Sequence, residues 1–206
     1  MFNEYGNIFL ENRYTDWQNY YPYRTLRNIW QLSRYVPAER IQVEFLNKWR
    51  NADKYAGDPF APAVHGFDYL FATTLAGQPL AWLESQNLPD EAFGIAPLVA
   101  AYRRVAAQFH AGIILPVGEE PSGRSWTGFQ SIVSDSEGYL LLYREATPSD
   151  TGTVDTFLPE GARITLERVL GYGAAADRQT VGRNGALRVT LPAGNTFALY
   201  KYTIRK

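Results

Sequence analysis

A short apolar run ends in a polar and aromatic cluster within the segment Gly6-Asn7-Ile8-Phe9-Leu10-Glu11-Asn12-Arg13-Tyr14-Thr15-Asp16-Trp17. The apolar part, residues 7–11, predicts a strand. The residues after it bring carboxylate, guanidinium, amide and aromatic groups together. In (β/α) barrels the catalytic groups lie at the carboxyl ends of the strands, where the following loops form the rim. The segment therefore predicts one strand of such a barrel and a part of its active site.

The same order of strand and helix is expected three times between residues 1 and 110. Strands are predicted at 7–11, 40–47 and 79–84. Helices are predicted at 19–35, across Val64 to Leu75, and from Pro97 to Phe109. This alternation is typical of parallel βα units. Because a closed barrel needs eight units, we interpret the chain as the tail of a longer enzyme; the alternative is a half-sheet completed in another way. An open sheet edge would favour self-association of the isolated chain.

The pattern changes near Ala111, after which no helical period is visible. Short strands separated by turn signals are predicted at 112–117, 126–134, 139–145, 154–158, 163–170, 186–191 and 197–204. Such a series is typical of an antiparallel β-sandwich. The predicted fold class is thus α/β plus all-β. Residues 1–110 would form the last three βα units of a (β/α)8 TIM barrel, and residues 111–206 an antiparallel β-sandwich domain.

Composition excludes several classes of function. The net charge is −1 and no dense basic run occurs, so nucleic acid and anionic membranes are not expected partners. No apolar stretch is long enough for a membrane-spanning helix. The chain has no cysteine, which excludes disulfides, thiolate metal sites and cysteine nucleophiles but leaves the compartment open. No signal peptide is visible at Met1.

The sequence also gives no support for a metal site or for a serine nucleophile. His65 and His110 are isolated, so we expect them at helix ends and expect no metal and no cofactor. Ser122 and Ser125 have no histidine in a readable arrangement, which argues against a serine hydrolase. Aromatic residues make up 15% of the chain, which suits sugar rings and packed cores equally well.

Several segments together resemble the C-terminal part of α-galactosidase (melibiase)-type glycoside hydrolases, especially those of Bacteroides-like gut bacteria. They are Glu11–Trp17, Asn19–Asn28, Gln42–Asn47, Asp68–Ala72, Pro79–Trp82 and Glu120–Gln130. The resemblance implies a catalytic barrel followed by a β-sandwich, an α-galactoside as substrate, and a periplasmic or secreted location in a bacterium. It makes Asp16, in Thr15-Asp16, the general acid/base of a retaining mechanism. The family's nucleophile lies in a Lys-Trp-Asp type motif that does not occur here, so we expect the chain alone to be inactive and to need the rest of the barrel.

Each candidate near the first strand has a structural alternative. Asp16 is a candidate acid/base, and it also suits the N-cap of the helix predicted near Asn19. Glu11 and Arg13 are candidates for binding sugar hydroxyls or for a structural ion pair at the rim. Trp17 and Tyr21 would form either a stacking wall for sugar or packed rim residues.

Later candidates rest on position alone. Glu44, Asn47 and Glu84, at or near the ends of the next two strands, are expected to line the site. The segment Pro121–Gln130 is interpreted as a packed joint between barrel and sandwich, with sugar contact as the alternative.

Two functions remain open from the sequence. The first is the C-terminal portion of a retaining α-galactosidase-like enzyme that hydrolyses terminal α-galactosides. The second is a non-catalytic carbohydrate-binding or interaction module built on the β-sandwich.

Overall fold

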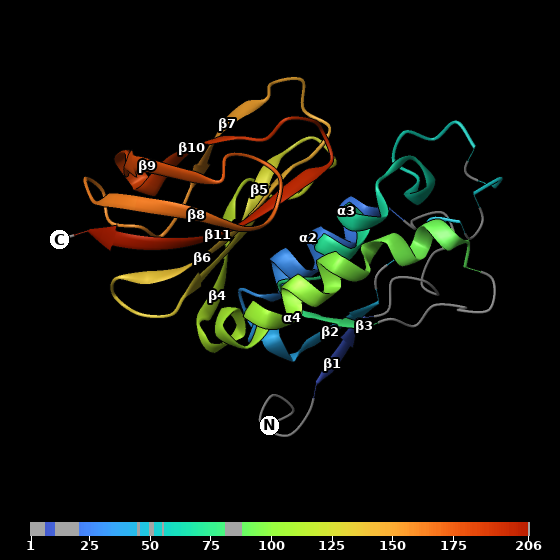
Figure 1. Cartoon of the computed structure of the whole chain (residues 1–206), viewed down its shortest axis with the longest axis horizontal. Helices are drawn as coiled ribbons and strands as arrows, with labels where there is room; N and C mark the ends of the chain where they lie inside the picture. Colours follow the sequence, from blue (N-terminus) through green and yellow to red (C-terminus); the bar gives the residue numbers. More distant parts are fainter. Residues whose placement is uncertain are drawn as a thin grey trace.

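A computed structural model describes residues 7–10, 21–44, 46–49, 52–54, 56–80 and 88–205. The chain forms a part with helices and a small parallel sheet, followed by a part built of antiparallel strands (Figure 1). Among the described residues, no helix is long and apolar enough to cross a lipid bilayer.

The first part contains a three-stranded parallel sheet in the order β1-β2-β3. Its strands are β1 (Ile8–Leu10), β2 (Ile41–Glu44) and β3 (Gln78–Leu80). Within the described ranges, β1 and β3 each pair with β2 alone. The predicted strands are therefore present and parallel within the described residues.

Helices α2 (Pro22–Leu32), α3 (Phe67–Ala72) and α4 (Ala96–Ala111) separate or follow these strands, with the 3-10 turns η1 (Ala38–Arg40), η2 (Pro62–Val64) and η4 (Asp90–Ile95) between them. Helix α4 has proline in its first turn and buries Tyr102 and Phe109, as predicted. The single helix expected across Val64 to Leu75 is wrong: η2 and the short helix α3 replace it. Thr73 and Thr74 donate side-chain hydrogen bonds to the carbonyls of Leu70 and Phe71, which accompanies the end of α3.

The second part is dominated by a six-stranded antiparallel sheet in the order β4-β5-β6-β11-β8-β9. Its strands are β4 (Ile113–Gly118), β5 (Trp126–Ile132), β6 (Glu137–Arg144), β8 (Arg163–Gly171), β9 (Ala176–Thr180) and β11 (Thr196–Arg205). Within the described residues, a second sheet holds β7 (Thr151–Asp155) and β10 (Ala186–Thr190), which pair antiparallel. The turn η5 (Arg183–Gly185) leads from β9 into β10. In that turn Gly185 has φ 76° and a Cβ there would lie 2.0 Å from the Thr156 carbonyl oxygen, so glycine is required.

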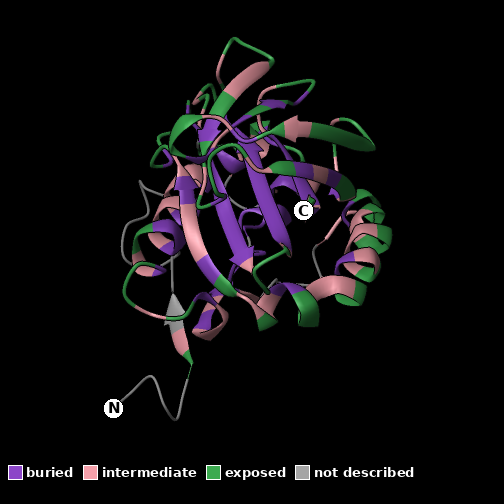
Figure 2. Ribbon diagram, turned by 90° about the vertical axis from the view of Figure 1, so that its left-hand side faces the viewer, coloured by how far each residue is buried: buried purple, intermediate pink, exposed green. Residues whose placement is uncertain are grey.

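The six-stranded sheet is covered on both faces, and alternation along β6 shows this directly. Leu140 and Leu142 pack with β7 and β10, whereas Tyr139, Leu141 and Tyr143 belong to the core that contains the helices. Figure 2 shows the long central strands buried over most of their length. The predicted two-layer sandwich is thus a six-stranded sheet with a two-stranded sheet on one face and helices on the other.

Polar contacts also join the two parts. The Tyr143 hydroxyl donates to the Ala72 carbonyl at 2.6 Å, and Ser131 Oγ donates to the Phe109 carbonyl at 2.6 Å. Trp30 Nε1 donates to the Val117 carbonyl at 3.3 Å. The division at residue 110 into two domains stays a prediction, because one continuous apolar core includes side chains from both sides of it.

Candidate functional site

The carboxyl ends of the three parallel strands define the candidate site, because parallel neighbours end at the same edge of a sheet. These ends are Leu10, Glu44 and Leu80. Three of the predicted site residues lie in the described part of the chain, namely Tyr21, Glu44 and Asn47. The others lie outside the described residues, so their roles stay predictions: Glu11, Arg13, Asp16, Trp17 and Glu84.

Glu44 and Asn47 lie at and just beyond the end of β2. Glu44 is the last residue of the strand and only 3% exposed. Asn47 is also buried, and its Oδ1 accepts a hydrogen bond from the backbone N–H of Trp49 at 3.0 Å. Trp49 in turn packs edge-on against Phe67 and donates from Nε1 to Glu91 Oε1 at 2.8 Å. Asn47 therefore has a visible structural role, in shaping the turn that follows β2.

Tyr21 links the segment before α2 to the loop after β2. Its hydroxyl donates to Asp58 Oδ2 at 2.5 Å, while Asp58 Oδ1 accepts from the backbone N–H of Phe60 at 2.9 Å. The hydrogen bond to Asp58, together with partial burial, raises the pKa of Tyr21 to about 12. Asp58 was not predicted as a site residue. Its only signal in the sequence is an acidic residue after glycine in a polar loop.

The ring of Tyr21 belongs to a packed aromatic cluster at this rim. It stacks on Tyr23 with centroids 5.8 Å apart, and Phe60 meets both rings edge-on. The Arg24 guanidinium lies 5.6 Å from the Tyr21 centroid. Of the two interpretations of Tyr21, these contacts favour a packed rim residue over a free stacking wall.

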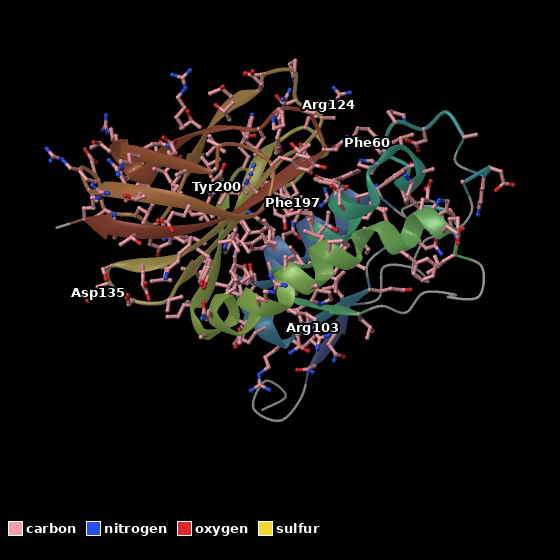
Figure 3. The ribbon with its side chains drawn as sticks, in the orientation of Figure 1. Phe60, Arg103, Arg124, Asp135, Phe197 and Tyr200 are labelled. Carbon is pink, nitrogen blue, oxygen red and sulfur yellow. The ribbon has the colours of Figure 1, made fainter. Side chains whose placement is uncertain are left out.

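The segment Pro121–Gln130 packs against the same cluster, as expected for a joint. Gly123, with φ 86°, approaches so closely that a Cβ there would lie 2.5 Å from Phe60 Cε1 and 3.4 Å from Tyr23 Cδ1. Figure 3 labels Phe60 near Arg124 of this segment. Gln31 donates from Nε2 to Oε1 of Glu120, the residue just before this segment, at 2.8 Å.

A buried carboxylate holds this joint segment in place. Glu145 is fully buried, and its Oε2 accepts the backbone N–H groups of Ser122, Gly123 and Ser125 at 2.9, 2.7 and 2.9 Å. Burial raises the pKa of Glu145, and these backbone hydrogen bonds act in the opposite direction. Glu145 was not predicted from the sequence, because its three donors lie about twenty residues away along the chain.

The two histidines and the two serines of the joint segment make hydrogen bonds within the fold. His65 Nδ1 lies 2.8 Å from the Ala61 carbonyl, and the Tyr102 hydroxyl lies 2.7 Å from His110 Nε2. Burial lowers the pKa of both histidines, that of His110 to about 4. The Ser122 and Ser125 hydroxyls bond to each other at 2.7 Å. No group of three or more histidine or acidic side chains in the described ranges is placed to hold a metal ion.

Comparison with solved structures identifies proteins of similar architecture. One is the galactosidase domain of the α-galactosidase–sucrose kinase AgaSK, with a TM-score of 0.63 and 13% identity. Another is the GH36 α-galactosidase AgaA from Geobacillus stearothermophilus, with a TM-score of 0.59 and 12% identity. Each match covers 91% of this chain. The chain shares its fold with part of two α-galactosidases.

The likeness to these α-galactosidases has defined limits. The chain spans 25% of the length of each, and at such low identity the likeness establishes the fold alone. No family model and no curated protein sequence matches the chain. The predicted relation to α-galactosidases is therefore supported at the level of fold, while the Bacteroides-like source and the closed TIM barrel stay predictions.

Proposed function

We propose that this chain is the C-terminal portion of an α-galactosidase-like glycoside hydrolase of the retaining type. The observation that carries the proposal is the order of parallel strand–helix units followed by an antiparallel sheet, matched over 91% of the chain in two α-galactosidases. In this proposal residues 1–110 are the last three units of a (β/α)8 barrel. The remaining strands supply the nucleophile and most of the sugar pocket.

Asp16 is the proposed general acid/base. It follows β1, the strand whose carboxyl end adjoins that of β2. A retaining glycosidase places two carboxyl groups about 5–5.5 Å apart across the sugar, one as nucleophile and one to protonate the leaving oxygen. Glu11, Arg13, Trp17, Glu44 and Glu84 are proposed to line the sugar around it.

The loops beside the carboxyl ends of the parallel strands are held by hydrogen bonds and packing, which supports a catalytic role for Asp16. The Tyr21–Asp58 hydrogen bond joins two of these loops, and the Glu145 carboxylate fixes the joint segment that packs on Phe60. Catalytic groups need positions defined within fractions of an ångström, which such fixed surroundings provide.

The test uses the polypeptide that contains this chain together with the remaining barrel strands. Asp16→Asn should lower kcat/KM for melibiose at least 100-fold, because the sugar leaving group needs a proton. The loss should be smaller for an aryl α-galactoside with a good leaving group, and azide should restore part of that activity. A merely structural residue would lower both activities together. Asp53→Asn, an exposed aspartate in the loop after β2, is the matched control and should change neither.

A loss of less than tenfold on melibiose in Asp16→Asn would remove the acid/base assignment. The 206-residue chain alone should show no turnover of either substrate. Turnover by the isolated chain would contradict the proposal that the nucleophile lies elsewhere.

A further inference from the structure

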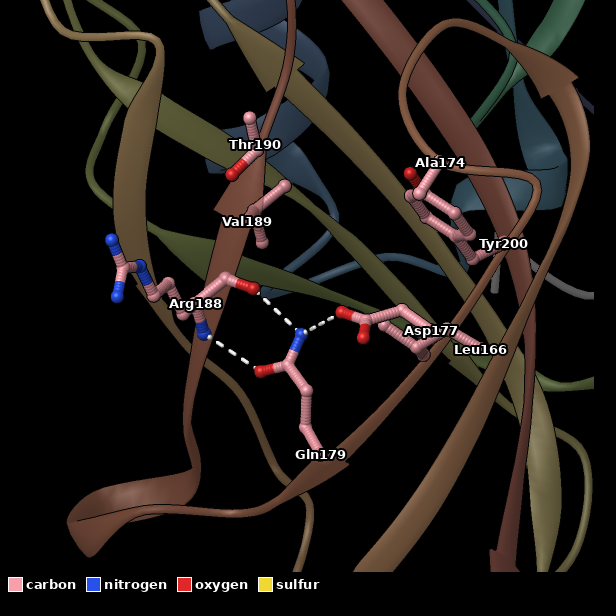
Figure 4. Close-up of a pocket in the computed structure, with 8 residues that line it drawn as sticks. All are labelled: Leu166, Ala174, Asp177, Gln179, Arg188, Val189, Thr190 and Tyr200. Atoms are coloured by element: carbon pink, nitrogen blue, oxygen red, sulfur yellow. Dashed lines mark hydrogen bonds between the residues drawn. The ribbon is translucent and has the colours of Figure 1, made fainter.

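A cavity lies in the antiparallel part, far along the chain from the proposed catalytic residue. Its volume is about 400 Å³, and it lies between β8, β9 and β11 of the large sheet and β10 of the small one (Figure 4). The size falls within the range of small-molecule pockets, near its lower end. Its apolar lining comes from Leu166, Val189 and the ring of Tyr200, which are all buried.

One side chain connects the two walls of the cavity. Gln179 on β9 donates from Nε2 to the Arg188 carbonyl at 2.7 Å and accepts the Arg188 N–H at Oε1 at 3.1 Å. Its Nε2 also donates to Asp177 Oδ2 at 2.6 Å. The carboxamide thus pairs with the backbone of β10 as a neighbouring strand would. The spacing between the walls is set before any ligand arrives, which reduces the entropy cost of binding.

The opposite end of the cavity presents a hydroxyl. In the part of the chain that the structure describes, no residue makes a hydrogen bond to the Tyr200 hydroxyl, and its oxygen is open to solvent although most of the residue is buried. Gly173, with φ 90°, leaves room beside it, since a Cβ at that position would lie 2.4 Å from the hydroxyl oxygen. The hydroxyl is therefore free to donate a hydrogen bond to water or to a ligand in the cavity.

The remaining polar groups define the chemistry of that ligand. Asp177 contributes a carboxylate, whose Oδ1 accepts the Arg178 N–H at 2.7 Å and whose Oδ2 accepts from Gln179, with one lone pair on each oxygen left for a ligand. Thr190 contributes a hydroxyl, which bonds to Thr151 at 3.0 Å. Asp177 and Arg188 place opposite charges in the lining, which gives no net attraction for an anion or a cation, and the polar groups disfavour a purely apolar ligand. A pyranose ring has apolar C–H faces and hydroxyls at its edge, which fit an apolar lining with polar ends.

We propose that the cavity between β8–β9 and β10 binds one neutral monosaccharide unit, held by Asp177, Thr190 and the Tyr200 hydroxyl around an apolar floor. This site does not depend on the proposed catalytic function. It lies in the antiparallel part and needs neither Asp16 nor the absent barrel strands, so the two proposals fail separately.

The experiment is isothermal titration calorimetry of the whole 206-residue chain with D-galactose, D-glucose and methyl α-D-galactopyranoside. We expect saturable binding of at least one of them with a Kd below about 10 mM. Asp177→Ala should weaken this binding about tenfold or more, because a hydrogen bond to a charged group is lost. Tyr200→Phe, which keeps the ring in the core, should weaken it about fivefold.

Asp135→Ala is the matched control, an exposed aspartate in the turn between β5 and β6 that Figure 3 places away from Tyr200. It should leave the affinity unchanged. Thermal unfolding of all three variants shows whether each retains the fold. The absence of saturable binding by all three sugars would overturn the proposal, and so would binding that folded Asp177→Ala and Tyr200→Phe proteins retain in full.

Discussion

The two parts of this molecule are stabilised in different ways. The antiparallel part has long ladders: β11 extends over Thr196–Arg205 and pairs with both β6 and β8. The parallel strands are three or four residues long, and their surroundings are helices that pack onto the large sheet. The helices of the first part therefore need the large sheet of the second part to bury their apolar side chains. Stability is shared across the predicted domain boundary, whereas the proposed chemistry lies on one side of it.

The largest expected effect is that of separating the two parts. A fragment of residues 111–206 would expose the face of the large sheet that carries Phe129, Tyr143 and Phe197 in the intact chain. We expect this fragment to aggregate or to bind a hydrophobic dye strongly, since an exposed apolar face of this kind favours association. Light scattering and dye fluorescence measure this. A fragment that is monomeric and as stable as the intact chain would show that the parts are independent domains.

Phe129→Ala tests the shared core with a single side chain. Phe129 is fully buried and meets the Tyr143 ring edge-on, so its truncation should cost about 3–5 kcal/mol of unfolding free energy. Phe157→Ala is the matched control, because Phe157 is 56% exposed and its truncation should cost far less. Urea denaturation of both variants provides the comparison. Equal costs would mean that the face between the parts is not a packed core.

His110 tests the polar contacts within the helical part. Its pKa falls from 6.5 to about 4 because burial disfavours the charged ring. The unfolded chain takes up a proton below pH 6.5 and the folded chain does not, so this contribution to stability is present above 6.5 and is lost as the pH falls toward 4. The difference corresponds to about 3 kcal/mol. Between pH 7 and pH 4 the native chain should lose unfolding free energy, and His110→Gln should lose up to about 3 kcal/mol less. If both proteins lose the same amount, the lowered pKa of His110 is contradicted.

Tyr21→Phe should have the smallest effect. It removes the hydrogen bond to Asp58, but water can replace it because both groups are only half-buried, so we expect a cost of about 1 kcal/mol. Tyr35→Phe, at a residue that is 82% exposed, should cost nothing measurable. Thermal unfolding compares the two. Equal effects would show that the Tyr21–Asp58 link does not hold the rim together.

The sequence predicted the parts of the fold that show periodic burial. The continuous apolar run of β6, which is buried on both faces, and the apolar stripe of α4 identified both elements. Strand β9 was missed, since Ala176–Thr180 is almost wholly exposed and contains no apolar alternation. The prediction of one helix across Val64 to Leu75 was wrong. The apolar residues there are divided between a 3-10 turn and a short helix, and apolar periodicity alone does not distinguish this arrangement from one long helix.

From the sequence, candidate site residues could be named only where their place in the chain or their side-chain type indicated them. Glu44 and Asn47 were predicted from their positions at a strand end and Tyr21 from its aromatic ring, and the structure adds the contacts of Tyr21 and Asn47. Asp58 and Glu145 were missed because their partners are distant in sequence. The cavity beside Tyr200 could not be predicted either, since four strands contribute to it and one of them was not recognised.

The most direct test of the central proposal is a crystal structure of the polypeptide that contains this chain and the remaining barrel strands, with a galactose analogue bound. The account predicts that β1, β2 and β3 are neighbouring strands of a closed barrel. It also predicts that the Asp16 carboxyl lies beside the glycosidic oxygen, about 5–5.5 Å from a second carboxyl group across the sugar. An Asp16 side chain that caps the following helix and faces away from the sugar would contradict it.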